Sequence, residues 1–576
     1  MIKQSLSQLT FLFLDRAAKD RFDAASLTTK LLALYERSVQ VRWIMPERRR
    51  KFWGWGWEGE GLTRDELKLL DPVWAKRLGV SEFDITPPPT AEEINLRTSR
   101  VSIPNSLEKI CTTDHYERLA HCYGQSFPDS VRIFQRDFSN PPDVVALPRT
   151  ELDVADIFDW CGNTGAAAIP YGGGSSVVGG VEPPQSERYR AAVTIDLRNL
   201  NRVLEIDSVS EAARIQAGAF GPALEAQLKP SGLTLRHFPQ SFEFSTLGGW
   251  IATRSGGHFA TLHTHIDELV ESVRVVTPRG IVETRRLPGD GAGPSADRLF
   301  IGSEGIFGII TEAWMRLRKR PTFRAGTTVN FADFYKAADA VRAISQAGLY
   351  PANCRLLDAQ EAAMAGAGDG HNALLVLAFE SADHPLDAWM NRALEICGDH
   401  GGEWDRSALE KAGSHREGAA GAWRNAFLRA CYLRENLTAR GVLSDTFETA
   451  ITWERFPDFH SNIKDEVHRV ISEVTGNRAW VTCRFTHVYP DGPAPYFTFV
   501  SMGNKEKLLD QFYTVKHAAS EALIKHGGTI THHHAVGRMH RPGYDRQRPD
   551  LFADALRAAK RELDPKWMLN PGVLID

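Results

Sequence analysis

The pattern of apolar and polar residues divides this chain into four regions. Apolar positions at helical spacing predict a mainly helical region over residues 1–140. Short apolar runs between glycine and proline turns predict a mixed α+β domain over 141–322. Strands alternating with helices predict a second α+β domain over 323–504, with a helical insertion at 405–440. The last region, 505–576, opens with a predicted long helix.

The first region carries two features of its own. Leucines 27, 31, 32 and 34 share one predicted helical face, and a further short helix is predicted over 91–96. Within 48–57, four cations precede three tryptophans interleaved with glycine. Arginine and tryptophan suit an anionic membrane surface. We favour the alternative, in which the aromatic rings pack against another domain and the cations stay exposed.

A glycine-rich stretch, 166–181, is the centre of the second region. A short apolar strand runs into three consecutive glycines and then two serines. Consecutive glycines let a backbone approach a ligand closely, and successive N–H groups form an anion-binding nest. No lysine follows, as a P-loop needs, and no long helix opens, as a Rossmann fingerprint needs. The stretch therefore predicts a pyrophosphate-bearing cofactor; the alternative is a glycine-rich surface loop.

Composition narrows the remaining choices. The net charge of −4 lacks the excess of positive charge that is typical of nucleic-acid-binding proteins, so we expect no nucleic-acid partner. The seven cysteines include no C-x-x-C pair, which argues against a disulfide frame or a zinc finger, and we expect no metal. No apolar run reaches the roughly 18–20 residues of a membrane span. Without a recognisable signal peptide, a cytoplasmic location is expected, with peripheral membrane contact as the alternative.

Four segments of the second region mix glycine with hydroxyl residues beside predicted strand ends. The candidate cofactor-binding residues are Pro170, Tyr171, Gly172, Gly173, Gly174, Ser175, Ser176, Pro239, Gln240, Ser241, Phe242, Glu243, Phe244, Ser245, Ala252, Thr253, Arg254, Ser255, Gly302, Ser303, Glu304, Gly305, Ile306, Phe307 and Gly308. Together the segments resemble the FAD-binding domain of the vanillyl-alcohol oxidase family, the PCMH-type flavoproteins. That resemblance implies FAD between two α+β subdomains, a cap domain for substrate, and a C-terminal segment returning to the FAD domain. The glycine loop has no His or Cys that could tether the flavin, so non-covalent FAD is expected.

A narrower resemblance covers nearly the whole chain. Six motifs occur in order, at 52–56, 355–358, 433–435, 447–449, 496–497 and 532–534. They are similar to those of the alkyldihydroxyacetonephosphate synthase (alkylglycerone-phosphate synthase) family, which makes ether lipids. The resemblance implies exchange of an acyl chain on dihydroxyacetone phosphate for a long-chain alcohol, without net redox. It further implies a lipid-like phosphorylated substrate, a fatty alcohol and a bacterial relative, and we expect a homodimer.

The candidate catalytic residues can also be weighed on their chemistry. Tyr496 is either a cross-strand aromatic or a proton donor and acceptor, and the resemblance gives it the second role. The run His532, His533, His534 follows a strand-like segment; neutral imidazoles move protons near pH 7, whereas packing is the alternative. The resemblance places this run in the active site.

Two arginines stand in apolar surroundings and need anionic partners. Arg355 and Arg434 have Asp358 and Glu435 nearby in sequence, or could bind a substrate phosphate. The resemblance assigns Arg355 to activity and Arg434 to substrate binding. The alternative function is an FAD-linked oxidase of a 2-hydroxy acid such as D-lactate, with the histidines as base and an arginine on the carboxylate. A third hypothesis is a non-catalytic flavin-binding subunit.

Overall fold

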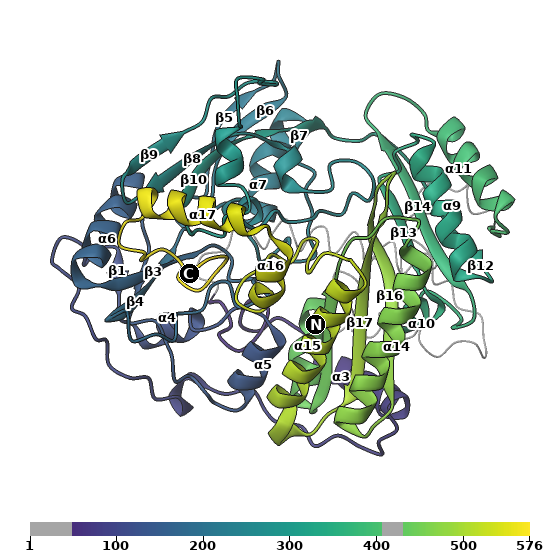
Figure 1. Ribbon diagram of the computed structural model, residues 1–576, viewed down its shortest axis with the longest axis horizontal. Coiled ribbons are helices and arrows are strands. Elements are labelled where there is room, and N and C mark those ends of the chain that lie inside the picture. Colours follow the sequence, from purple (N-terminus) through teal and green to yellow (C-terminus); the bar gives the residue numbers. More distant parts are fainter. Residues whose placement is uncertain (1–48, 406–429) are drawn as a thin grey trace.

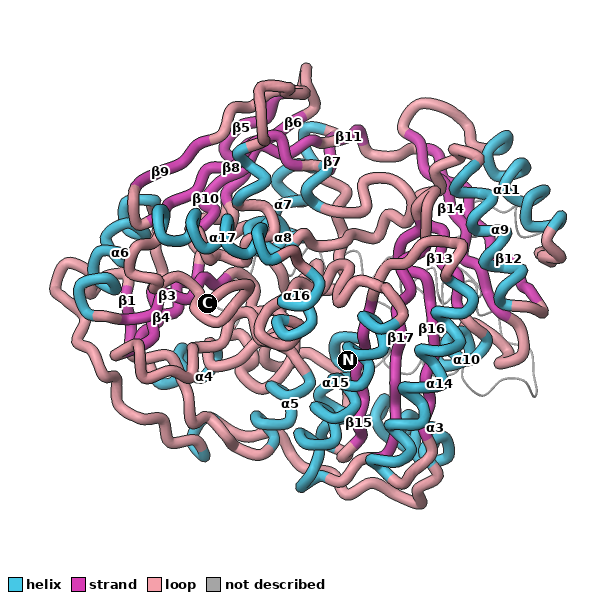
Figure 2. Tube along the Cα trace, viewed as in Figure 1, coloured by secondary structure: helices cyan, strands magenta, loops and turns pink. Residues whose placement is uncertain are grey.

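The computed structural model describes residues 49–405 and 430–576, which form two lobes with separate sheets (Figure 1). Figure 2 shows loops filling the space between the sheets of the two lobes. The leucines predicted to form a helical face near residue 30 lie outside the described residues, as does most of the predicted insertion at 405–440. Its described part, 430–439, is helical. Among the described residues, no helix is long and apolar enough to cross a membrane.

A four-stranded sheet of order β1-β2-β4-β3 begins the first lobe. Strands β2, β4 and β3 run parallel, and every residue of β4 is buried, as expected for a parallel strand covered on both faces. Helix α6 packs on β3; it begins at a capping box formed by Thr150 and Asp153 and ends at Gly165, whose φ is 68°. The elements are β1 (Cys111–Thr112), β2 (Val144–Ala146), α6 (Glu151–Thr164), β3 (Ala166–Tyr171) and β4 (Ala191–Asp196).

An antiparallel sheet of order β5-β6-β10-β8-β9 completes the first lobe, beside the small pair β11-β7. One continuous hydrophobic core joins this sheet to the parallel one. The strands are β5 (Val203–Asp207), β6 (Ala212–Gln216), β7 (Leu233–Thr234), β8 (Val270–Thr277), β9 (Gly280–Glu283), β10 (Ile309–Arg316) and β11 (Arg318–Lys319). The helices are α7 (Gly221–Leu228) and α8 (Leu247–Thr253). The mixed α+β architecture predicted from the apolar runs is confirmed.

The second lobe is a six-stranded antiparallel sheet of order β12-β14-β13-β16-β17-β15. One face packs against helices in a second core that is rich in phenylalanine. The strands are β12 (Phe323–Phe331), β13 (Asn353–Leu357), β14 (Ala373–Ser381), β15 (Val442–Glu448), β16 (Ala479–Val488) and β17 (Pro493–Met502). The helices are α9 (Phe334–Gln346), α10 (Ala359–Met364), α11 (Asp387–Asp399), α14 (Phe456–Thr475) and α15 (Leu508–Lys525).

The register of this sheet aligns polar side chains on its other face. Tyr496 of β17 pairs with Arg484 of β16 on one side and with Glu448 of β15 on the other. Directly opposed residues project from the same face, so these three side chains share one surface. A β-bulge between Phe485 and His487 brings His487 opposite Ala494, onto that same surface.

The C-terminal region crosses back from the second lobe to the first, drawn in yellow in Figure 1. Helices α16 (Arg541–Gln547) and α17 (Asp550–Leu563) precede a segment in which Leu569 forms a parallel bridge with Ala168 of β3. The Lys560 ammonium donates to the carbonyls of Ile306 and Leu569. These contacts attach the last residues to the first lobe.

The described chain also contains α3 (Arg64–Leu78), which precedes β1, and α4 (His115–Ala120) and α5 (Phe127–Phe134), which lie between β1 and β2. The helix predicted over 91–96 is only a single 3-10 turn, Ala91–Glu93, because residue 94 already has extended backbone angles. Much of the chain between α3 and α4 is irregular.

Candidate active site

The first two glycine-rich segments touch each other. A Cβ on Gly173 would lie 1.9 Å from the carbonyl oxygen of Phe244, and a Cβ on Gly172 would lie 2.3 Å from Thr246 Oγ1. Both distances are shorter than any real Cβ contact, so only glycine permits the approach. The loop after β3 is therefore seated directly on the segment 239–246.

The other two segments join the same place. A Cβ on Gly305 would lie 2.6 Å from Pro170 Cγ, and a Cβ on Gly302 would lie 2.8 Å from Arg254 Cδ. The fourth segment thus contacts both the first and the third. All four predicted segments converge, although they are far apart in the sequence.

This convergence suits the diphosphate of FAD. Within the described residues, the backbone N–H groups of Gly173, Gly174 and Ser175 donate no hydrogen bond. The buried Thr246 Oγ1 beside them has no hydrogen-bond partner among the described atoms. Gly174 has φ 60°, which turns successive N–H groups in one direction. A row of amide donors next to a buried hydroxyl fits phosphate oxygens, so the residues present can hold the cofactor.

Several predicted cofactor residues use their side chains to build the fold. Ile306 and Phe307 lie in the first hydrophobic core, which leaves only their backbone for a ligand. The buried Glu304 carboxylate accepts hydrogen bonds from the N–H groups of Val536 and Gly537, both at 2.9 Å, and burial raises its pKa to about 7. Glu304 therefore fastens the segment that follows the histidine run.

The second and third segments are braced by Trp250. Its indole N–H donates to Ser245 Oγ at 2.7 Å, and the Phe242 ring stacks on it with centroids 6.2 Å apart. In the third segment, the Arg254 side chain pairs with Asp267 at 3.2 Å. These contacts hold the loop backbones in place around the cofactor site.

The tryptophan-rich segment 49–57 packs against both lobes. Trp55 is buried, and its ring lies 5.6 Å from that of Phe244 in the second glycine-rich segment. Lys51 forms a buried ion pair with Glu435 at 3.1 Å, and Glu435 also accepts from the Trp55 N–H. The favoured interpretation of this segment, packing against another domain, agrees with these contacts. The Lys51 cation, however, is buried and not exposed.

The histidine run surrounds the carboxylate of Glu448, which ends β15. Glu448 accepts from the backbone N–H groups of His532, His533 and His534 and from the Thr531 hydroxyl. The Glu448 side chain is 1% exposed, and despite this burial the nearby histidines hold its pKa well below the usual range. The segment 527–531, predicted as strand-like, is irregular: the N–H groups of Gly528, Thr529 and Ile530 donate to three separate partners, in Leu523, Ala450 and Gln547.

The three imidazoles differ in their contacts. His533 Nδ1 lies 3.1 Å from His532 Nδ1, and the rings of His533 and His534 lie 5.9 and 5.5 Å from that of Tyr496. Burial lowers the pKa of all three, to about 3 for His532. All three are therefore neutral at pH 7 and able to accept or pass a proton. A Cβ on Gly256 would lie 3.1 Å from His533 Cβ, which places the run beside the third glycine-rich segment.

Tyr496 lies at the centre of the polar face of the second sheet. Its hydroxyl donates to Thr446 Oγ1 at 2.9 Å, and the Arg484 guanidinium lies 3.9 Å from its ring centroid. Burial raises the phenol pKa, so Tyr496 carries its proton at neutral pH. It can therefore serve as a proton donor toward the neighbouring histidines.

The arginines do not pair with the acids adjacent to them in sequence. Arg434 pairs with Asp445 at 3.0 Å, and not with Glu435, which is taken by Lys51. Asp358 pairs with Lys464, so it is not the partner of Arg355. Both sequence-based structural partners were wrong: in the described structure Glu435 pairs with Lys51, and Asp358 pairs with Lys464.

Arg355 and Arg434 nevertheless both lie close enough to Tyr496 to interact with it electrostatically. Arg355 is 2% exposed, and burial together with nearby Arg484 lowers its pKa to about 9. Asp445 also contacts the Lys516 ammonium at 3.3 Å, so two cations share one carboxylate. That excess of positive charge suits an anionic substrate group.

The site also contains three residues that were not predicted from the sequence. His487 contributes a ring nitrogen within 4.8 Å of those of His532 and His533, a spacing that a transition metal could bridge. Tyr489 contacts His532 Nε2 through its hydroxyl at 2.7 Å, and His265 Nε2 lies 3.3 Å from that same nitrogen. In the sequence, His487 and Tyr489 were marked only by polarity in a largely apolar run, and His265 lies in an ordinary polar stretch that gives no signal.

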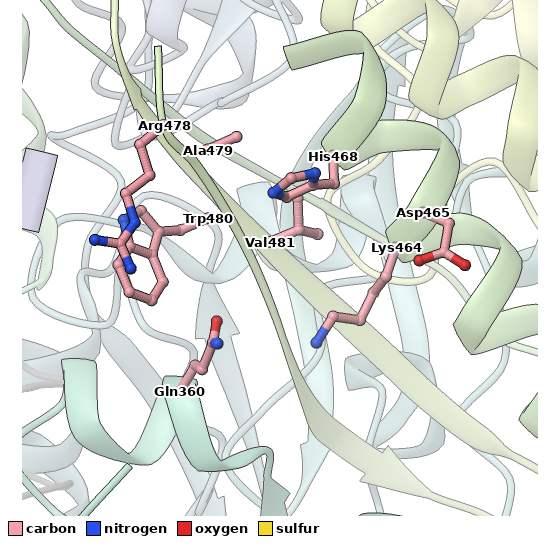
Figure 3. Close-up of a pocket in the computed structure, with 8 residues that line it drawn as sticks. All are labelled: Gln360, Lys464, Asp465, His468, Arg478, Ala479, Trp480 and Val481. Carbon is pink, nitrogen blue, oxygen red and sulfur yellow. The ribbon is translucent and has the colours of Figure 1, made fainter. Parts of the chain in front are cut away.

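An open groove of ≈ 340 Å³ lies elsewhere on the second lobe (Figure 3). Its lining comes from α10, α14 and the start of β16: Gln360, Lys464, Asp465, His468, Arg478, Ala479, Trp480 and Val481. None of the predicted site residues lines it. The groove therefore does not mark the active site.

Two family profiles match the chain, one within the first lobe and one over the second lobe together with the C-terminal region. A family profile described as "FAD binding domain" matches residues 142–285, and one described as "FAD linked oxidases, C-terminal domain" matches 320–574. These two matches show that FAD is the cofactor.

Relatives of known name extend over most of the chain. An alkyldihydroxyacetonephosphate synthase of Trypanosoma brucei brucei is 30% identical over 532 residues, 89% of this chain and 83% of the relative. That of Dictyostelium discoideum is 30% identical over 515 residues, 86% and 83% of the two chains. A solved structure of an alkyldihydroxyacetonephosphate synthase superposes with a TM-score of 0.76 at 27% identity, covering 91% of this chain and 98% of that one. The chain belongs to the alkyldihydroxyacetonephosphate synthase family.

Proposed function

We propose that this protein exchanges the acyl chain of acyl-dihydroxyacetone phosphate for a long-chain fatty alcohol, with bound FAD and no net redox. The observation that carries the proposal is the placement of Tyr496 and the histidine run around Glu448, beside the four converging segments. The names of the relatives at 30% identity support the same reaction. A fatty acid leaves from C1 and an ether bond to the alcohol replaces it.

The chain's own residues account for proton movement in this exchange. When bound, FAD supplies an electron-accepting ring system to the substrate carbon. His533 and its neighbours, neutral at pH 7, would take the proton from C1. Tyr496, protonated and hydrogen-bonded to Thr446, would give a proton to the departing carboxylate or return one to C1.

The two arginines would hold the anionic parts of the substrate. Arg434, with Lys516 on the other side of Asp445, would bind the phosphate through its planar guanidinium fork. Arg355 would add a buried positive charge near Tyr496 and so favour the negative charge that develops during exchange. Binding at the phosphate would thus orient C1 toward the histidines.

One assay tests the proposal against the alternative. The purified FAD-loaded protein is mixed with acyl-dihydroxyacetone phosphate and labelled hexadecanol, without an electron acceptor. Labelled ether product is the expected result. Bleaching of the flavin by a 2-hydroxy acid such as D-lactate, with no ether formed, would overturn the proposal in favour of an oxidase.

We also propose a homodimer that works in the cytoplasm and contacts membranes peripherally. The argument for membrane contact is the chemistry of its substrates, because two long acyl or alkyl chains partition into lipid. Residues 49–57 do not argue for it, since Trp55 and Lys51 are buried. Sedimentation velocity tests the dimer, and co-flotation with anionic vesicles tests the membrane contact.

A further inference from the structure

A line of hydrogen bonds leads from the histidine run toward the surface. His533 Nδ1 lies 3.1 Å from His532 Nδ1, and His532 Nε2 lies 2.7 Å from the Tyr489 hydroxyl. That hydroxyl lies 3.1 Å from His265 Nε2. His265 is partly exposed, whereas Glu448, at the inner end, is buried. The line therefore joins the inside of the site to solvent.

The direction of each hydrogen bond follows from one fixed point. A carbonyl oxygen only accepts, so the contact at 3.0 Å between His265 Nδ1 and the Arg254 carbonyl places the proton of a neutral His265 on Nδ1. His265 Nε2 is then an acceptor, and the Tyr489 hydroxyl can donate to it while the Thr264 hydroxyl, 3.1 Å away, donates to the Tyr489 oxygen. The Tyr489 oxygen in turn accepts from His532 Nε2–H.

The same reasoning extends inward. If His532 carries its proton on Nε2, its Nδ1 is an acceptor, and the His533 Nδ1–H donates to it. His533 Nε2 is then left with a lone pair, as a base requires. Every bond in the line can thus point outward at once, from His533 to His265.

We propose that Tyr489 and His265 form a proton relay that connects His533 with solvent during the exchange reaction; this inference rests on the proposed function. The C1 proton binds His533 Nε2, and the Nδ1 proton of His533 passes to His532 Nδ1. The Nε2 proton of His532 passes to the Tyr489 oxygen, and the Tyr489 proton passes to His265 Nε2. His265 becomes a cation at the partly exposed end and exchanges with water; the return of a proton reverses each step.

The neighbouring histidine His487 does not offer an equivalent route. Its Nε2 lies 2.9 Å from the Gly257 carbonyl, so that nitrogen holds its proton in a fixed bond. Its Nδ1 faces the Thr486 hydroxyl at 3.1 Å, and His487 is buried. Protons that reach His487 therefore have no described path outward.

The test measures deuterium uptake against product. The FAD-loaded protein turns over acyl-dihydroxyacetone phosphate and hexadecanol in D2O, and mass spectrometry gives deuterium at C1 per ether formed. The relay variants are Tyr489→Phe and His265→Gln, which remove a hydroxyl and a ring nitrogen pair. Tyr335→Phe is the matched control, because Tyr335 makes a like hydrogen bond of 3.0 Å to His460 on the outer side of the second lobe.

We expect deuterium per ether to fall about tenfold or more in His265→Gln and by a smaller factor in Tyr489→Phe, where His532 Nε2 still lies 3.3 Å from His265 Nε2. It should stay unchanged in Tyr335→Phe, with flavin absorbance equal in all. A role in folding alone would lower ether and deuterium together and leave their ratio unchanged, and that result overturns the relay. So does a wild-type protein that forms ether without deuterium. Absence of ether from the wild type refutes the proposed function itself, and the relay with it.

Discussion

Removing the charge of Glu448 gives a quantitative test of how the histidine run is held. Glu448→Gln keeps one acceptor oxygen, which can still serve the Thr531 hydroxyl and the His534 N–H. Its amide group replaces the oxygen that faces the His532 N–H, so one donor there meets another donor. A hydrogen bond to a charged group contributes about 1.5–3 kcal/mol.

We therefore expect the hydrogen bonds that hold residues 532–534 in place to lose about 2–3 kcal/mol of stabilising free energy. If the transition state loses the same amount, kcat/KM falls about 30- to 150-fold. Ether formation measures kcat/KM, and flavin absorbance reports whether FAD still binds. Glu448→Asp keeps the charge and should lose less. Glu466→Gln is the control, since Glu466 accepts from His526 and Lys525 at a partly exposed site away from the run.

The pH dependence of stability follows from the same group. The native pKa of Glu448 lies below its usual value of 4.5, so its charge stabilises the native state fully above that value. This contribution is lost as the pH falls from about 4.5 toward the lower native pKa. Urea midpoints of wild type and Glu448→Gln should therefore differ at pH 7 and converge on acidification. Equal kcat/KM and equal midpoints at pH 7 would refute the reasoning.

Four other outcomes are expected. Tyr496→Phe should lower ether formation by 100-fold or more with FAD still bound, because a general acid or base contributes about that much; full activity would remove Tyr496 from the mechanism. Gly173→Ala should abolish FAD binding because its Cβ meets the Phe244 carbonyl, whereas Gly289→Ala, with nothing within 4 Å, should bind FAD normally by absorbance titration. Arg434→Lys should raise KM for the phosphorylated substrate about tenfold with a smaller change in kcat, since lysine lacks the fork; an unchanged KM would exclude phosphate binding there. Heat precipitation should release all yellow colour to the supernatant, and colour retained in the pellet would indicate a covalent flavin.

The parts of this site that sequence predicts are those that depend on local backbone. The three glycines after β3 predict that this loop lies in close contact with another part of the chain, because no other residue tolerates such an approach. The structure shows that the loop contacts other glycine-rich segments. Tyr496 and the histidine run were found through resemblance to a family. Their neighbours could not be inferred from spacing, since Glu448 and Tyr489 come from separate strands or loops of the second lobe.

His487 shows why a pattern alone fails at such a site. Strict alternation along β16 puts residue 487 on the face opposite Arg484, toward the phenylalanine-rich core. The β-bulge adds one residue and reverses that parity, so His487 emerges beside Tyr496. The ion pairs predicted for the two arginines were wrong for a related reason. Asp358 and Glu435 are near them in sequence but pair with Lys464 and Lys51, which come from distant elements.

The bridge between Leu569 and Ala168 has a consequence for biosynthesis. A ribosome releases the strand that holds Ala168 long before it has made the residues that flank this strand. The first lobe, which binds FAD, therefore stays incomplete while the whole second lobe leaves the ribosome and folds. Flavin capture in the cell should accordingly be a late event that follows synthesis of residue 569, and a nascent chain stalled before residue 568 should remain colourless.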